Sequence, residues 1–548
     1  MKRYLKLWIL PFILVVLSLG VQNLALSAWN SVVDFNAPEF SVEPGGKSEA
    51  LTHQVVIVVV DALRVDTFNK MKYLSGLKQN GAFFVLKTGE PSLSLPGWTV
   101  ISTGAYQEIT GVTTNWFEGP VSSDSIFSEA ETNGLQAAIV GTDGWEVLFS
   151  NVTKRISARK WDSYITFDEE TLSIAFDYLK ENPNLLLVHF VDTDESGHQF
   201  GGASSEYQGY ADHIDTLIEE LLRNLSKDTI LIITADHGTI NTGGHGGWED
   251  VVTYVPLLIY GKGIKIGDFG RANQTDIAPT VSILLGIPIP SKSQGNILFD
   301  ALDLDEGKKA ELSYLLLNQK LRFAEGYTKS LGMQGPPIAS VPENLSFKDV
   351  FEKSKMLDEN VASQKKERIR SEQISNIPLF LIVLLLPIIA FWYLKKRFSL
   401  SYKIPFSCSL LYLVFYNAIF FGSGKNISLS SINQEANLAQ FFNTAMAYAA
   451  VSVIISVLIL SFIERKKTRY EVARDTVLLS AFVAFLLALQ IDLFFLYNGP
   501  LIKWYIPNMF LTFKYYLDML TFLATGFVSV VLPFISMGFV WVLRKTRV

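Results

Sequence analysis

The stretch HQVVIVVVDALR, residues 53–64, contains six consecutive Val and Ile residues, and Asp61 follows them directly. A short, continuous apolar run of this kind is typical of a strand that is buried on both faces of a sheet. Similar runs occur later in the chain: LQAAIVG from Leu135, NLLLVHFVD from Asn184, DTILIITAD from Asp228 and VPLLIYGKG from Val255. Helical patterns such as residues 207–225 lie between these runs. The alternation predicts an α/β fold in which a mainly parallel sheet is sandwiched by helices.

The composition indicates a second, apolar part of the protein. The chain has 548 residues, of which 49% are hydrophobic and only 18% are charged, and this balance favours a membrane portion. The net charge of −6 is small for this length and argues against a nucleic-acid-binding protein. Because Cys408 is the single cysteine, an intrachain disulfide and a cysteine-based zinc site are both excluded. A metal site would therefore use His, Asp, Glu or hydroxyl ligands.

Long uncharged runs predict six membrane spans. Residues 7–33 are long enough to cross a bilayer, so we expect an uncleaved anchor rather than a cleaved signal peptide. Five further runs predict a C-terminal bundle: Ile374–Leu394, Ile404–Gly424, Ala436–Ile463, Thr476–Tyr497 and Met519–Leu543. Basic clusters precede the first span and follow alternate later spans, which predicts that both termini are cytoplasmic. The domain after the first span is then extracytoplasmic, at the cell surface or in the lumen of the endoplasmic reticulum.

These patterns divide the chain into four segments. We expect a membrane anchor at residues 1–33 and an extracytoplasmic α/β domain at residues 34–305. A helical connector should follow at residues 306–373, and a membrane domain of about five transmembrane helices should occupy residues 374–548.

Polar residues follow three of the predicted strands. These residues are Asp61 after the first strand, Asp192, Asp194 and His198 after LLLVHF, and Asp236 and His237 after ILIITA. The carboxyl ends of parallel strands are where α/β sheets bind ligands, so we expect these side chains to meet at one edge. A single carboxylate at a strand end is usually a turn or cap residue. Three clusters, two of them with a histidine, favour a shared site.

The donor types in these clusters indicate a metal centre. Three carboxylates and three imidazoles are available: Asp61, Asp194, Asp236, His198, His237 and His245, the last within the glycine-rich stretch TADHGTINTGGHGG. This set could hold two divalent ions, and mixed Asp and His ligation suits zinc, with manganese or iron as substitutes. Paired metals stabilise the attacking and leaving oxygens of a phosphoryl group. The sequence leaves Asp192 open between a residue that supports a ligand and a cap at the strand end.

A nucleophile for such a centre could come from EPSLSLPGWTVISTG, residues 90–104. Ser94 precedes Pro96, so the chain should turn there and begin a helix whose first amides face an anion. A serine at this point is also an ordinary helix cap. The spacing alone leaves both interpretations of Ser94 open.

The motifs together carry a family resemblance. VVVDALRVDTF, SLPGWTVISTG, HFVDTDESGHQFG and ADHGTINTGGHGG resemble, in this order, motifs of the alkaline phosphatase superfamily. Within it the chain resembles the type I phosphodiesterase/nucleotide pyrophosphatase branch. QTDIAPTVSILLGIPIP from Gln274 and the order of anchor, domain and bundle are most similar to the glycosylphosphatidylinositol (GPI) ethanolamine phosphate transferases. The resemblance covers roughly residues 50–300 and implies an alkaline phosphatase-like catalytic domain.

The resemblance also implies roles for individual residues. One zinc would be held by Asp61, Asp236 and His237, with Ser94 bridging as its alkoxide. The second zinc would be held by Asp194, His198 and His245. Ser94 matches the nucleophile that forms a covalent phospho-serine, and Asn115, in TGVTTNWFEGP, matches a residue that contacts a phosphate oxygen.

The resemblance implies a membrane-bound phosphotransferase. It would move a phospho-head-group such as phosphoethanolamine from a phospholipid donor to a glycan or glycolipid acceptor, in biosynthesis like that of GPI anchors. A hydrolase of nucleotide or lipid phosphodiesters with the same site is the alternative, although a hydrolase with a single anchor needs no membrane bundle. A non-catalytic membrane scaffold is disfavoured because all six ligand candidates and the hydroxyl are present.

Overall fold

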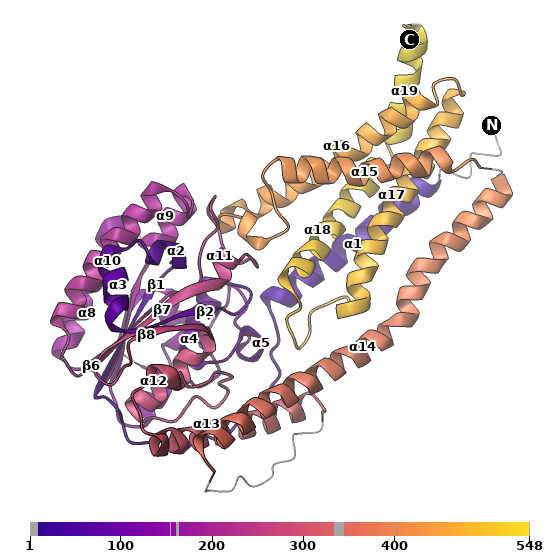
Figure 1. The fold of residues 1–548 in the computed structure, drawn as a ribbon. Helices are drawn as coiled ribbons and strands as arrows, with labels where there is room; N and C mark the ends of the chain where they lie inside the picture. Colours follow the sequence, from indigo (N-terminus) through magenta and orange to yellow (C-terminus); the bar gives the residue numbers. More distant parts are fainter. Residues whose placement is uncertain (1–8, 154, 161–163, 334–344, 399, 547–548) are drawn as a thin grey trace.

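The computed structural model describes residues 9–153, 155–160, 164–333, 345–398 and 400–546. An α/β domain at one end is joined to a bundle of long helices at the other (Figure 1). The basic residues Lys2, Arg3, Lys6 and Arg547, and the first two residues of the predicted anchor, lie outside the described residues.

The α/β domain is built on one sheet of eight strands, in the order β4-β3-β5-β1-β6-β7-β2-β8. The strands are β1 (Gln54–Val60), β2 (Ala82–Lys87), β3 (Ala137–Thr142), β4 (Ile156–Arg159), β5 (Leu185–Phe190), β6 (Thr229–Thr234), β7 (Tyr254–Tyr260) and β8 (Gly267–Asn273). Strand β1 is central and pairs in parallel with β5 and β6. Only the pairings of β7 with β6 and with β2 are antiparallel. The predicted mainly parallel α/β sheet is confirmed.

The five predicted strands are β1, β3, β5, β6 and β7. The sequence did not predict β2, β4 and β8. Strand β8 lies at the edge of the sheet, and its side chains are exposed or half-buried, so it has no continuous apolar run. Strand β4, at the other edge, is half-buried throughout. The apolar-run pattern therefore missed both edge strands, and it also missed β2, which is an interior strand between β7 and β8.

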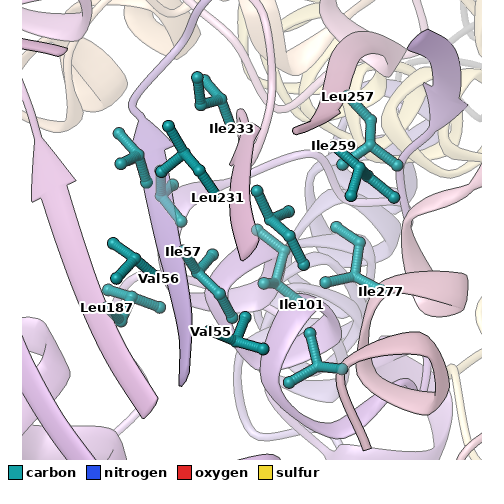
Figure 2. Packing of buried hydrophobic residues seen from close by; sticks show 14 of the residues in the cluster. Val55, Val56, Ile57, Ile101, Leu187, Leu231, Ile233, Leu257, Ile259 and Ile277 are labelled. Atoms are coloured by element: carbon teal, nitrogen blue, oxygen red, sulfur yellow. The ribbon is translucent and has the colours of Figure 1, made fainter. Parts of the chain in front are cut away.

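Helices cover both faces of the sheet (Figure 1). Helices α8 and α10 pack together with α9 and α3 on one side, while α4, α6 and α12 pack together on the other. Residues of β1 such as Ile57 pack among side chains of the neighbouring strands. Ile101 of α4 and Ile277 of α12 belong to the same cluster (Figure 2). The helices of this domain are α2 (Val65–Phe68), α3 (Lys72–Leu77), α4 (Ser94–Thr103), α5 (Gln107–Thr110), α6 (Ile126–Thr132), α7 (Gly144–Phe149), α8 (Tyr164–Lys180), α9 (Asp192–Phe200), α10 (Ser205–Asn224), α11 (Asp250–Thr253), α12 (Ile277–Leu285) and α13 (Glu306–Ser330).

The remaining helices fit an integral membrane protein. They are α1 (Ile9–Val33), α14 (Phe347–Phe398), α15 (Lys403–Gly422), α16 (Leu438–Ile463), α17 (Arg469–Asn498), α18 (Met509–Val528) and α19 (Leu532–Lys545). Five helices are long and apolar enough to cross a membrane, and the α18–α19 pair makes six if it is counted as one span. The sixth predicted span, Met519–Leu543, is not one straight helix, because the chain bends by 58° between α18 and α19. The charged sequence before residue 374 continues without a break into the second span, as one helix, α14.

The two ends of the described bundle lie on the same side of it. Figure 1 shows that the Ile9 end of α1 and the C-terminal end of α19 both point away from the α/β domain. Arg544 donates to the backbone carbonyl of Arg465, so two of the predicted basic clusters lie side by side at that end.

The buried centre of β1 gives a first testable prediction. Ile57 has no exposed surface, and Ile57→Ala removes apolar atoms from a packed core. We expect the free energy of unfolding to fall by about 2–5 kcal/mol, seen as a lower thermal midpoint of the detergent-solubilised protein. Ile266→Ala is the matched control, because Ile266 is 65% exposed. Equal midpoints for the two variants would contradict the buried position of β1.

Candidate active site

The three predicted polar clusters lie at the ends of adjacent strands. Strands β5, β1 and β6 are neighbours and run in parallel, so their carboxyl ends share one edge of the sheet. Asp61 directly follows β1, and Asp236 and His237 follow β6. Helix α9 begins two residues after β5 and carries Asp194 and His198 one turn apart on the same face. The sheet topology therefore brings together residues that are far apart in the sequence.

The first group of donors surrounds the His237 ring. The Nε2 atom of His237 lies 3.4 Å from Asp61 Oδ1 and 3.4 Å from Asp236 Oδ2. The hydroxyl of Ser94 lies 3.2 Å from the same nitrogen. The Ser94 side chain thus points into the cluster.

The second group of donors lies beside the first. His198 Nε2 is 3.3 Å from Asp194 Oδ2, and His245 Nε2 is 3.6 Å from Asp194 Oδ1. The two Nε2 atoms are 3.3 Å apart. The rings of His237 and His245 stack with centroids 3.9 Å apart, so the two groups form one continuous centre.

The geometry distributes the carboxylates differently from the resemblance. Donor atoms of Asp194, His198 and His245 lie within 4.8 Å of one another, and so do those of Asp61, Asp194 and His237. Asp194 therefore faces both groups. Asp236 accepts hydrogen bonds from the Trp98 indole at one oxygen and from two backbone amides at the other, which holds its carboxylate rigidly beside His237.

The electrostatic environment of the centre favours a bound positive charge. Burial, together with repulsion from Asp236 and Asp194, raises the pKa of Asp61 well above its ordinary value. Burial and Asp194 likewise raise the pKa of Asp236 to about 7. Burial, then the neighbouring His237, lowers the pKa of His245 to about 3, so its imidazole is neutral at neutral pH. Burial likewise lowers the pKa of His237 to about 4, whereas at His198 burial is outweighed by attraction to Asp194, which raises the pKa of His198 to about 9. A cluster of carboxylates that holds a proton on a neighbouring histidine favours positive charge, which divalent cations can supply.

The individual atoms fit such cations. Asp61 Oδ1 and Asp194 Oδ1 are buried and have no hydrogen-bond partner among the described residues, although a buried oxygen without a partner is costly. Each histidine directs Nε2 into the centre, while its Nδ1 faces an oxygen: Gly238 O for His237, Ser92 O for His245 and Asn433 Oδ1 for His198. Imidazoles held in this way present a free Nε2 lone pair to a metal ion.

Ser94 begins helix α4 rather than capping it. The cap position belongs to Leu93, and the Ser94 hydroxyl contacts His237 instead of a backbone amide of its own helix. Asn115 Oδ1 accepts a hydrogen bond from the Leu95 amide, so Asn115 lies against the first turn of α4. Both residues line a cavity of about 320 Å³. A helix N-terminus directed at this cavity favours an anionic group beside Ser94.

Sequence reasoning missed residues that support the ligands. His189, inside β5, is fully buried, and its Nε2 bonds Asp61 Oδ2 at 3.1 Å. Gln274, in the QTDIAPT motif, donates to the Ala235 and Asp236 carbonyls and braces the end of β6. Asp192 is fully buried at the start of α9, and neither of its oxygens has a hydrogen-bond partner among the described residues.

Comparison with known proteins agrees with this geometry. Residues 55–258, which include Asp61, Ser94 and the histidines of the centre, match the family model of type I phosphodiesterase/nucleotide pyrophosphatases. This segment is similar to the phosphodiesterase domains of that family. The resemblance predicted from the four motifs is confirmed.

Relatives of known function match about half of the chain. GPI ethanolamine phosphate transferase 3 of Schizosaccharomyces pombe is 25% identical over 287 residues, which are 47% of this chain and 31% of the yeast protein. The catalytic subunit of human GPI ethanolamine phosphate transferase 2 is 27% identical over 305 residues, 49% of this chain and 30% of the human protein. The matches therefore span about a third of the length of these relatives.

Among solved structures, the alkaline phosphatase PafA aligns with 46% of this chain. The alignment covers 100% of the PafA chain, at 14% sequence identity and a TM-score of 0.41.

The shared position of Asp194 gives a test of the metal centre. Asp194→Ala removes a donor from both groups, so we expect the full-length protein to lose tight binding of both divalent ions. Asp192→Asn is the control. Burial, then the neighbouring Asp168, raises the pKa of Asp192 to about 9, so the carboxyl is already neutral near pH 7. Metal analysis after dialysis against buffered zinc measures both variants, and an Asp194→Ala protein that keeps two ions per chain would rule out this arrangement.

Proposed function

We propose that the protein is a membrane-bound phosphotransferase that carries phosphoethanolamine from a phospholipid to a glycan or glycolipid. The observation that carries this proposal is the cavity that joins the Ser94 centre to the membrane helices. Its walls combine Ser94, Asn115 and His198 of the candidate site with residues of α1, α16 and α18 such as Val32, Leu438 and Phe513.

The cavity suits a molecule with a polar head and an apolar tail. Metal-site donors and the N-terminus of α4 at one end would bind a phosphate, whereas Trp29, Val32 and Phe513 would contact hydrocarbon. A water-soluble nucleotide does not need an apolar wall supplied by membrane helices. The names of the relatives identify phosphoethanolamine as the group that those proteins transfer. We propose the lipid donor from the apolar residues that line the cavity.

The chain supplies the nucleophile and the binding groups. Two divalent ions, which we propose to be zinc with manganese as a substitute, would lower the pKa of the Ser94 hydroxyl and neutralise charge on the phosphate. Asp61, Asp194, Asp236 and the three histidines would hold them. Asn115 lies against α4 beside Ser94, where its free amide group can donate to a phosphate oxygen.

Two displacements then complete the transfer. Ser94 Oγ forms a bond to phosphorus while the bond from phosphorus to the diacylglycerol oxygen breaks, and the departing oxygen takes up a proton. An acceptor hydroxyl next attacks the phospho-serine, and Ser94 Oγ leaves. Water in place of the acceptor gives the alternative hydrolase.

We further propose that both termini are cytoplasmic, which places the catalytic domain on the other side of the membrane. The positive residues at the end of the bundle far from the α/β domain favour this orientation.

Replacing the nucleophile tests the chemistry. Ser94→Ala should lower the rate of head-group release from labelled phosphatidylethanolamine by about a thousand-fold or more, because the covalent route is lost. Ser102→Ala removes a hydroxyl from the same helix and should keep the wild-type rate, since Ser102 bonds only the Trp98 carbonyl. Label that reaches a glycolipid acceptor supports transfer, and label found only in water-soluble phosphoethanolamine supports hydrolysis. Full activity of Ser94→Ala would refute the mechanism.

Blocking the membrane end of the cavity tests the lipid donor. Thr512 of α18 lines the cavity, so Thr512→Trp should reduce turnover of a long-chain phospholipid by about ten-fold or more. Turnover of a short, water-soluble phosphoethanolamine ester should change little, because the Ser94 end stays open. Leu511→Trp is the matched control, since Leu511 is 47% exposed and does not line the cavity. Equal losses with both substrates would show that the tail does not lie in this cavity.

A further inference from the structure

The loop between two membrane helices lies directly on the metal centre. Residues 425–437 connect α15 to α16, and Figure 1 shows this turn reaching the α/β domain near α11. The loop contains two short turns, η5 (Leu429–Ser431) and η6 (Glu435–Asn437). The Ser430 hydroxyl accepts from the Gly247 amide and donates to Glu249. The Trp248 indole donates to the Ile427 carbonyl.

The glycines of GGHGG leave room for this loop. A Cβ atom at Gly247 would collide with the Ser428 hydroxyl, and one at Gly244 would collide with the Ser430 carbonyl. Gly243 and Gly244 also have positive φ angles, of 88° and 105°. The glycines on both sides of His245 thus serve two purposes, since they let the chain turn and let a membrane-domain loop approach the metal centre.

Asn433 in this loop makes two hydrogen bonds to a single residue, His198. Its Nδ2 group donates to the His198 carbonyl at 2.6 Å, and its Oδ1 lies 3.0 Å from His198 Nδ1. The first bond fixes which way the amide points, because only the NH₂ group can donate to a carbonyl. Oδ1 must then face the ring, where it can only accept. A proton of His198 is therefore held on Nδ1, and Nε2, which faces Asp194 and His245, is the ring atom left to bind a metal ion.

We infer that Asn433 is a positioning residue for the second metal ion, and that the membrane domain therefore completes the catalytic centre. His237 and His245 are oriented by backbone carbonyls of the α/β domain itself, Gly238 O and Ser92 O. For His198 this acceptor comes from a loop 235 residues further along the chain. The inference rests on the proposed two-metal function. It adds that a domain without residues 425–437 would bind its second ion weakly.

Zinc affinity of the metal-stripped, full-length protein in detergent tests this inference. Asn433→Leu keeps the approximate size of the side chain but has no acceptor, so we expect the affinity for one of the two ions to fall by about 10–100-fold. Asn433→Asp keeps an oxygen that accepts from Nδ1–H and should bind both ions within a few-fold of wild type. Ser430→Ala removes a contact of the same loop that does not touch His198, and should also keep both affinities. A competition titration with a chromophoric chelator measures all four proteins, and thermal melting checks that each one folds.

The outcomes separate this inference from the proposed function. Wild-type affinity in Asn433→Leu would overturn the positioning role and leave the two-metal enzyme intact. An equal loss of zinc affinity in Ser430→Ala would also overturn it, because the loop would then act only by docking on the domain. A loss of affinity in Asn433→Asp as large as that in Asn433→Leu would overturn it as well, because the acceptor oxygen would then have no effect. A wild-type protein that binds no divalent ion would refute the proposed metal chemistry and this inference together.

Discussion

The repulsion among three carboxylates, two of them buried and one partly buried, is the constraint on which the rest of the site depends. Asp61, Asp194 and Asp236 converge because β5, β1 and β6 are adjacent and parallel, and burial makes their mutual repulsion strong. Such a cluster is stable only if cations or protons offset its charge. The surrounding structure favours cations, since it directs Nε2 of all three histidines inward and burial keeps His237 and His245 neutral. We therefore propose that the sheet topology shapes the centre for divalent ions.

Rigid support from the domain keeps these carboxylates in place. Trp98 of α4 bonds Asp236, His189 of β5 bonds Asp61, and the rings of Trp98 and His189 pack edge to face. The helix that presents Ser94 thus also holds Asp236, a candidate metal ligand. Gly97 allows this approach, because a Cβ atom there would lie 2.9 Å from Asp236 Cβ. The proposed nucleophile and the proposed metal centre are coupled through one helix, so a shift of α4 would move both.

The sequence predicted the interior of the fold better than its edges, and the ligands better than their supports. Continuous Val and Ile runs identify β1 and β6 because burial on both faces favours apolar side chains, whereas edge strand β8 carries no such signal. Asp194 and His198 could be selected as ligand candidates because metal ligands need particular residue types at fixed spacing. A residue that supports a ligand needs only a donor or an acceptor, which many residues provide. His189, inside an apolar strand, and Asn433, in a loop, therefore carried no motif.

The contact between Asn433 and His198 bears on why the catalytic domain is joined to a membrane bundle. A bundle that only anchored the domain could be connected through a free linker. Instead, the 425–437 loop walls the cavity with Leu429 and Ile432, and the same loop orients a metal-ligand candidate through Asn433. A lipid that enters between the membrane helices would press on the surface that positions His198. The same loop would then respond to a lipid in the cavity and hold His198 in place for the second metal ion. Such coupling would favour reaction of a membrane-bound phospholipid over hydrolysis of a water-soluble phosphodiester.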